Sequence, residues 1–154
     1  MSRLVTAFGD EFASGESPCF VRPGFTGDRL NRLLVHVAVG QERTTAVLDT
    51  GGAFLILDPT FATLIGIDHA HALARDRIHL RGFVRHGTIH RMPLTLLATT
   101  GQSLTFEVTA FVPKLEEGET WPLPSYLGWQ GCLDRIRFAI DPVDEIVYFG
   151  AADS

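Results

Sequence analysis

Residues 46–57 read Ala46-Val47-Leu48-Asp49-Thr50-Gly51-Gly52-Ala53-Phe54-Leu55-Ile56-Leu57, which sets one acid inside an otherwise apolar run. An ionised carboxylate is costly to bury unless neighbouring groups stabilise it. The Thr-Gly-Gly that follows Asp49 turns a chain tightly and offers backbone N–H groups. The pattern therefore predicts a buried strand, a sharp turn that presents the carboxylate, and a second buried strand. The alternative is a plain turn in which Asp49 bonds its own backbone.

The composition is that of a globular protein. The chain has 154 residues, of which 45% are hydrophobic and 20% are charged, and this length favours one domain. The net charge of −5, with no basic cluster, argues against a nucleic-acid partner. We expect a cytoplasmic protein without a membrane partner, because Met1–Asp10 lacks an apolar leader segment and no run of about 18 apolar residues follows.

Short apolar runs separated by Gly and Pro favour strands over long helices. One short helix is predicted after Asp58, which can cap it, with Pro59 in its first turn and Gly66 as its stop. We expect an irregular N-terminal extension over residues 1–29 and a folded domain over residues 30–154. That domain is predicted to be an all-β, closed or partly closed barrel with one or two short helices. The expected strands cover residues 33–39, 43–48, 53–57, 77–83, 88–97, 104–111, 135–140 and 145–149.

Three features, in this order, carry a family resemblance. The first is Val47-Leu48-Asp49-Thr50-Gly51-Gly52, and the second is a central hairpin from Ile78 to Ile89. The third is Tyr126-Leu127-Gly128, followed by a short turn at Gly131–Asp134 and a strand. Together they resemble the retropepsin-like aspartic proteases, which are single-lobe relatives of pepsin. The resemblance covers about residues 30–150 and implies a small barrel of the acid-protease type.

The resemblance implies a role for each of these segments. Asp49 would be the catalytic residue, and the hairpin would be a flap over the substrate, with its connection at Val84–Gly87 and with Arg85 and His86 near its tip. The implied site residues, besides Asp49, are the loop residues Thr50, Gly51 and Gly52, the flap residues Leu80, Arg81, Gly82, Phe83 and Val84, and the loop-supporting residues Tyr126, Leu127 and Gly128.

The implied function is that of an aspartic endopeptidase. Two aspartates would activate a water between them, and because this chain has one such motif, a homodimer would supply the second Asp49. The partners would be a peptide or protein substrate and a second copy, with neither a cofactor nor a metal. The alternative is a non-proteolytic module of the retropepsin fold that serves dimerisation or peptide binding.

Other chemistry-bearing residues give weaker signals. Zinc sites need three or four ligands, and no Cys or acid completes a set with the histidines. Cys19 and Cys132 fit no metal or redox spacing, and Cys132 is expected to be a buried apolar residue. The apolar residues nearest the site predict hydrophobic substrate side chains on both sides of the cleaved bond, with an acidic preference further out from Arg85 or His86. Those apolar residues are Leu55, Ile56, Phe83, Val84 and Ile89, and the histidines are His69, His71, His86 and His90.

Overall fold

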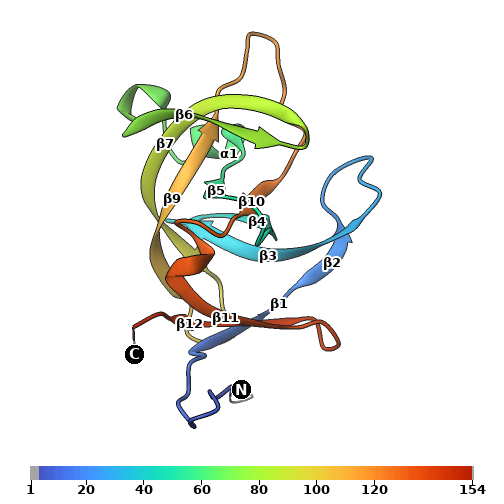
Figure 1. Cartoon of the computed structure of the whole chain (residues 1–154), viewed down its shortest axis with the longest axis vertical. Coiled ribbons are helices and arrows are strands. Elements are labelled where there is room, and N and C mark those ends of the chain that lie inside the picture. The colour runs from blue at the N-terminus through green and yellow to red at the C-terminus, as the bar shows by residue number, and fades with distance from the viewer. Residues whose placement is uncertain (1–3, 154) are drawn as a thin grey trace.

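The structure is a computed structural model that describes residues 4–153, and it is built almost entirely of short strands (Figure 1). The first three residues of the predicted extension and the last residue of the predicted domain lie outside this range. The strands are β1 (Gly15–Pro18), β2 (Phe20–Pro23), β3 (Asn31–Val39), β4 (Glu42–Leu48), β5 (Leu55–Ile56), β6 (Ala74–Leu80), β7 (Phe83–Leu96), β8 (Thr100–Gly101), β9 (Leu104–Pro113), β10 (Ser125–Leu127), β11 (Ile136–Asp141) and β12 (Ile146–Ala151). The helices are α1 (Pro59–Leu64) and the 3₁₀ turns η1 (His69–His71) and η2 (Leu133–Arg135).

The larger sheet nearly closes on itself. Its strand order is β2-β3-β4-β10-β5-β9-β7-β6, and β7 also pairs with β3. This extra pairing places Val37 opposite Leu96 and Ala38 opposite Thr95, and it joins the run from β3 to β7 into a small barrel. Joining the strands in this way removes exposed edges, which would otherwise offer unpaired backbone groups. The predicted all-β, partly closed barrel is confirmed.

The N-terminal segment differs from the expectation. Residues 15–18 form β1, which pairs with β12 inside the smaller sheet β11-β12-β1-β8, and residues 20–23 form β2 on β3. Residues 1–29 were expected to be irregular, and for residues 15–23 this expectation is wrong. The reason is non-local: β12 comes from the far end of the chain and supplies the hydrogen-bonding edge that β1 needs.

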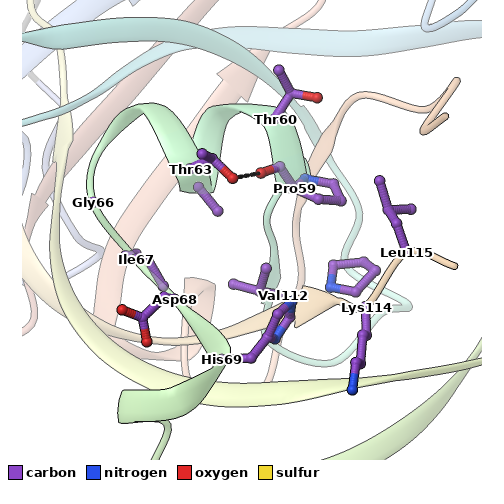
Figure 2. Close-up of a pocket in the computed structure, with 12 residues that line it drawn as sticks. Pro59, Thr60, Thr63, Gly66, Ile67, Asp68, His69, Val112, Lys114 and Leu115 are labelled. Carbon is purple, nitrogen blue, oxygen red and sulfur yellow. Dashed lines mark hydrogen bonds between the residues drawn. The ribbon is translucent and has the colours of Figure 1, made fainter. Parts of the chain in front are cut away.

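Helix α1 begins and ends where the sequence predicts. The Asp58 carboxylate accepts the Thr60 N–H at 2.8 Å, Pro59 occupies the first turn, and Gly66 follows the helix with a φ of 82°. Figure 2 shows the helix beside the end of β9, with the Thr63 hydroxyl donating to the Pro59 carbonyl at 3.1 Å. Among residues 4–153, no helix is long and apolar enough to cross a membrane.

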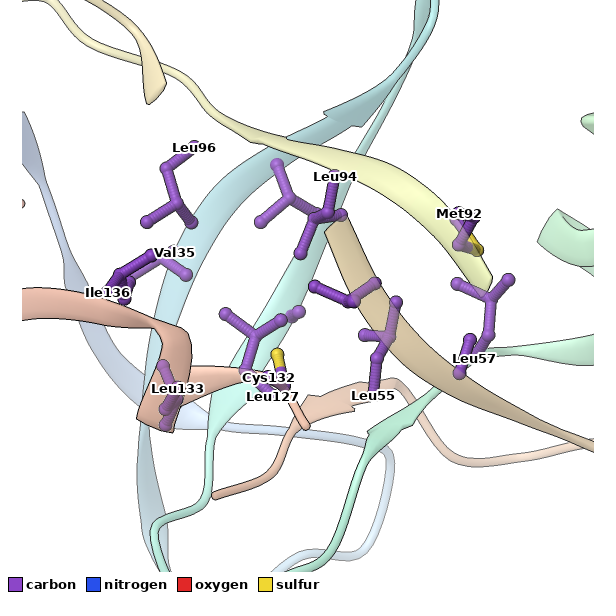
Figure 3. Packing of buried hydrophobic residues seen from close by; sticks show 14 of the residues in the cluster. Val35, Leu55, Leu57, Met92, Leu94, Leu96, Leu127, Cys132, Leu133 and Ile136 are labelled. Carbon is purple, nitrogen blue, oxygen red and sulfur yellow. The ribbon is translucent and has the colours of Figure 1, made fainter. Parts of the chain in front are cut away.

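The barrel interior is packed with apolar side chains and both cysteines. Figure 3 shows part of this packing, with Cys132 among the labelled residues. Alternate residues of the strands beside Asp49 point into it, because side chains along a strand alternate between its two faces. Val35, Ala46, Leu55 and Leu127 belong to this set and are each at most 2% exposed. The interior therefore fixes the strands on both sides of the Asp49 turn.

The intervening residues form a second apolar layer outside the barrel wall. Leu34, Val47, Tyr126 and Ile56 are successive cross-strand neighbours, so their side chains form one row on that face. We call this layer the outer cluster, and its buried members are Leu34, Val47, Ile56, Leu80, Phe111 and Tyr126. Because Leu80 comes from the end of β6, the outer cluster attaches the β6–β7 hairpin to the barrel wall beside Asp49.

Candidate active site

Asp49 directly follows β4, on a loop whose backbone is fixed by hydrogen bonds. The Asp49 N–H donates to the Leu127 carbonyl at 2.9 Å, which continues the β4–β10 pairing beyond the strand. The Gly51 N–H donates to Asp49 Oδ1 at 3.2 Å, and the Gly52 N–H donates to the Asp49 carbonyl at 3.1 Å. Asp49 thus bonds its own turn, as the plain-turn reading predicts, while its half-buried side chain also borders a cleft.

Residues 126–130 pass beside this loop and hold it in place. Phe54 has a φ of 63°, a left-handed conformation that costs a non-glycine residue about 1 kcal/mol or more. Two backbone hydrogen bonds hold it there, from its N–H to the Gln130 carbonyl (2.9 Å) and from the Gly128 N–H to its carbonyl (2.8 Å). The Trp129 N–H also donates to the Gly52 carbonyl at 2.6 Å. These contacts are consistent with the predicted loop-supporting role of Tyr126-Leu127-Gly128, which stays a prediction.

Gly128 is at this position because nothing larger fits. A Cβ atom there would lie 2.3 Å from the Phe54 carbonyl oxygen and 2.7 Å from the Ala53 carbonyl carbon. Both atoms belong to the backbone that follows the Asp49 loop, so neither can rotate away as a side chain could. The close approach of two backbone segments therefore requires glycine.

The β6–β7 hairpin lies over the outer cluster, but its turn is not where the sequence analysis puts it. The turn residues are Arg81 and Gly82, with φ values of 52° and 80°, and the strands on either side pair from Leu80 opposite Phe83. Arg85 and His86 therefore lie within β7 and not at the tip. Of the predicted flap residues, Leu80 is buried, while Arg81, Gly82, Phe83 and Val84 are exposed.

A cleft of about 620 Å³ lies between the Asp49 loop and this hairpin. Its wall combines a half-buried acid, an apolar floor from the outer cluster and several charged side chains. The lining residues are Arg32, Asp49, Gly51, Gly52, Ala53, Phe54, Ile56, Asp76, Arg77, Ile78, His79, Leu80, Arg81 and Tyr126.

The predicted apolar pocket is only partly correct. Ile56 does line the cleft, but Leu55 points into the barrel interior and is fully buried. Phe83 and Val84 are exposed and do not line the cleft, because the turn at Arg81 and Gly82 turns the chain back before them. Phe54, Ile78 and Leu80 take their place as apolar lining residues.

Arg85 contacts the loop between β9 and β10 and not the cleft. Its guanidinium forms an ion pair with Glu119 and lies 5.4 Å from the centre of the Trp121 ring. The Glu116 N–H and Arg85 hold the pKa of the Glu119 carboxyl below its ordinary value, with the backbone N–H as the larger cause. The acidic loop between β9 and β10 is therefore fixed to β7, and Arg85 does not line the cleft.

Arg32 reaches the cleft from β3 and is held by Asp28. The guanidinium donates to both carboxylate oxygens, at 3.0 Å from Nε and 3.2 Å from Nη2. The N–H groups of Gly24 and Leu30 donate to the same carboxylate at 3.0 and 3.2 Å. Arg32 first, and then these N–H groups, hold the pKa of Asp28 well below its ordinary value.

This pair gives a prediction on stability. The ordinary pKa of Asp is about 3.9, so the carboxylate contributes its full stabilisation above that pH and loses it as the pH falls through the lower, folded-state pKa. We expect Asp28→Asn to unfold at lower urea concentration than the wild type at pH 7, with a difference that shrinks steadily below pH 4. Urea denaturation from pH 7 to pH 2.5 measures this. The control is Asp144→Asn at an exposed turn, and a difference independent of pH would contradict the prediction.

A second hollow, of about 660 Å³, lies between α1 and the end of β9 (Figure 2). It contains Asp68 and His69 but not Asp49.

The histidines near it have protein partners. His71 Nδ1 lies 2.8 Å from Asp68 Oδ1, and the Thr88 hydroxyl bridges His69 Nδ1 and His90 Nε2 at 2.7 and 2.8 Å. Within residues 4–153, no group of three or more His, Cys, Asp or Glu could hold a metal. The Asp49 cleft is the better candidate because its carboxylate lies on a hydrogen-bonded Asp-Thr-Gly loop, whereas the Asp68 carboxylate is bound by the backbone N–H and the ring of His71.

The cysteines carry no site chemistry. Both are buried in the barrel interior, and burial raises the pKa of the Cys132 thiol to about 12. A thiol with this pKa stays protonated near neutral pH and is a poor nucleophile. Cys132 is thus a buried apolar residue, as predicted.

Several cleft residues are not identifiable from the sequence. Arg32, Arg77 and His79 carry no motif, and the first lies in a different part of the chain from the hairpin. The one available signal is the alternation of basic and apolar residues over Arg77–Leu80, which predicts a strand but not what it faces.

The comparisons with known proteins bear on the fold. No protein-family model matches the chain, and no curated protein matches its sequence. A crystal structure of a retropepsin-like aspartic protease from Rickettsia conorii is similar, with a TM-score of 0.53 and 19% sequence identity, over 89% of this chain and 91% of that chain. At this identity the similarity is one of architecture and not of residues. The chain therefore has the retropepsin-like fold that its sequence predicts.

Proposed function

We propose that this chain is an aspartic endopeptidase that acts as a homodimer, with one Asp49 from each protomer. The observation that carries the proposal is the setting of Asp49: a carboxylate on a hydrogen-bonded Asp-Thr-Gly loop, facing a cleft of about 620 Å³ beside a β-hairpin. The retropepsin-like fold supports the same conclusion by analogy.

The chemistry follows from two carboxylates held close together. They cannot both ionise cheaply, so the pair shares one proton, and aspartic proteases are the usual example of this effect. The ionised Asp49 takes a proton from a water molecule, whose oxygen attacks the scissile carbonyl carbon. The protonated Asp49 of the other protomer donates its proton to the carbonyl oxygen. Phe54, Ile56, Ile78 and Leu80 supply an apolar wall for the side chains beside the cleaved bond.

Two exposed features support a second copy at this site. Thr50 and Gly51, at the tip of the loop, are exposed, and a two-fold axis through the site would bring the loops of the two protomers together. Trp129, whose N–H donates to the Gly52 carbonyl, is itself 49% exposed. A large exposed aromatic residue beside a site is typical of an interface between proteins.

Dilution tests the dimer. If cleavage needs two protomers, specific activity falls about tenfold for each tenfold dilution below the dimer dissociation constant, by mass action. The measurement is hydrolysis of peptides with an apolar centre over a series of protein concentrations, with sedimentation velocity at the same concentrations. Constant specific activity from a demonstrated monomer would contradict the proposed dimer, and a stable dimer that cleaves no peptide would favour the binding-module alternative.

A further inference from the structure

We propose that the cleft selects peptides with an acidic side chain near the cleaved bond, bound by Arg77 and Arg81. This inference rests on the proposed function and names its substrate class. An extended peptide rises about 3.3 Å per residue, so a hairpin beside it reaches side chains within about three positions of the cut. The preference arises from residues other than Arg85 and His86, which the sequence analysis considers for that role.

The arginines that line the cleft differ in whether a carboxylate already pairs with them. Arg32, Arg77 and Arg81 all line the cleft. Arg32 is neutralised by Asp28 through two hydrogen bonds. Among the residues that the structure describes, neither Arg77 nor Arg81 forms an ion pair with a carboxylate. Both residues border the cleft and have no carboxylate partner among the described residues, so their guanidinium groups are available to a ligand there.

The side chain of Arg81 is held in place by an aromatic ring. Its guanidinium lies 4.4 Å from the centre of the Phe25 ring, within the range of a cation–π contact. Stacking restricts the guanidinium, whose planar N–H edge matches the geometry of a carboxylate. Arg81 also keeps a φ of 52°, in the left-handed region that favours glycine. The turn therefore presents a fixed cation beside the cleft at some cost in backbone energy.

Few acidic side chains line the cleft beside these arginines. With the Arg32–Asp28 pair counted as neutral, Asp76 is the one lining acid apart from Asp49. The Asp76 carboxylate accepts the backbone N–H of Arg77 at 2.7 Å and not its guanidinium. Arg77 and Arg81 balance Asp49 and Asp76 in formal charge, so the cleft is neutral while the chain as a whole carries a net charge of −5.

The same geometry limits where the acid can bind. The floor of the cleft is apolar, and a substrate carboxylate beside the catalytic pair would face like charge. The arginines instead belong to β6 and its turn, across the cleft from the Asp49 loop. We therefore place apolar side chains at the cleaved bond and the acidic side chain on a flanking position.

Matched peptides test the inference. The first peptide has Phe-Leu at its centre, with one Glu three positions before this pair and one Glu three positions after it. The other two peptides carry Gln or Lys in place of each Glu. We expect the Glu peptide to have a kcat/KM about tenfold above the Gln peptide, as for other charge-assisted hydrogen bonds, with the Lys peptide lowest. The preference should shrink as salt is raised from 0.05 to 0.5 M.

Three variants assign the preference to residues. Arg77→Gln and Arg81→Gln should each reduce the ratio of Glu to Gln cleavage severalfold, and the double variant should abolish it. Arg75→Gln is the matched control, because Arg75 lies on the same strand but does not line the cleft. An unchanged ratio in the double variant, or equal cleavage of the Glu and Gln peptides by the wild type, would overturn the inference.

Binding separates this inference from the proposed function. Fluorescence anisotropy of the labelled peptides with the Asp49→Asn protein measures the preference without cleavage. If the wild type cleaves none of the peptides, the proposed function fails, yet tighter binding of the Glu peptide that depends on Arg77 and Arg81 would still support the acidic preference. Equal binding of the Glu and Gln peptides would overturn that preference whether or not cleavage occurs.

Discussion

Replacing Asp49 with Asn is expected to lower kcat/KM for peptide cleavage by about 10⁴-fold or more. In a symmetric dimer the change removes both the general base and the general acid, and each such group contributes about 10²- to 10⁴-fold. Asn has nearly the same shape and can still accept the Gly51 N–H, so the loop should keep its conformation. Folding and dimerisation are expected to survive, because the two carboxylates no longer compete for one proton. The measurements are initial rates, the thermal midpoint and the sedimentation coefficient.

Two further experiments sharpen this test. Asp144→Asn removes one charge at an exposed turn and should leave the rate unchanged. Mixing wild type with a large excess of Asp49→Asn should inhibit cleavage, because exchanged dimers carry one aspartate and one asparagine. An Asp49→Asn protein that cleaves at near the wild-type rate, or a mixture that retains full activity after exchange, would remove Asp49 from the proposed mechanism.

Replacing Gly128 with Ala is expected to have the largest effect on stability, about 2–4 kcal/mol. The added Cβ would lie 2.3 Å from the Phe54 carbonyl oxygen, so the two backbone segments must separate. That separation breaks the hydrogen bond from the Gly128 N–H to the same carbonyl and releases the strained Phe54. Because Phe54 lies directly beyond the Asp49 turn, activity should fall along with stability. For a chain of this length the thermal midpoint should drop by about 4–16 °C.

The control for this variant is Gly118→Ala. Unlike Gly128, Gly118 has a positive φ, of 77°, and a Cβ there would meet nothing within 4 Å. Its substitution should cost about 1–2 kcal/mol through backbone conformation alone and leave activity unchanged. If the two variants lose the same stability and both stay active, the close approach at Gly128 does not support the loop.

The position of the β6–β7 turn could not be predicted from the sequence. Gly82 and Gly87 are both candidate turn residues by composition. In the structure Gly87 lies inside β7, opposite Pro113, where a Cβ would meet the Val112 carbonyl oxygen at 2.3 Å. That glycine serves a close contact with β9, and the turn therefore falls at Arg81 and Gly82. The pairing of β7 with β9 decides between the two, and it is non-local.

The features that can be predicted from the sequence are local ones. The Asp49 turn follows from a carboxylate beside Thr-Gly-Gly, and the ends of α1 follow from Asp58 and Gly66. The β3–β4 hairpin follows from two strand-forming runs separated by Gly40-Gln41. Each depends on residues close together in the chain, whose conformational preferences are properties of those residues.

Contacts between distant segments of the chain depend on tertiary packing. The pairing of β1 with β12, the contact of Gly128 with Phe54 and the stacking of Arg81 on Phe25 each bring together residues separated by long stretches of chain. Such contacts form because burying the barrel interior and the outer cluster holds the strands in one register, and a change of one residue in that register would reverse which side chains face the cleft. The carboxylate can be found in the sequence, whereas the arginines that share its cleft are brought there by packing.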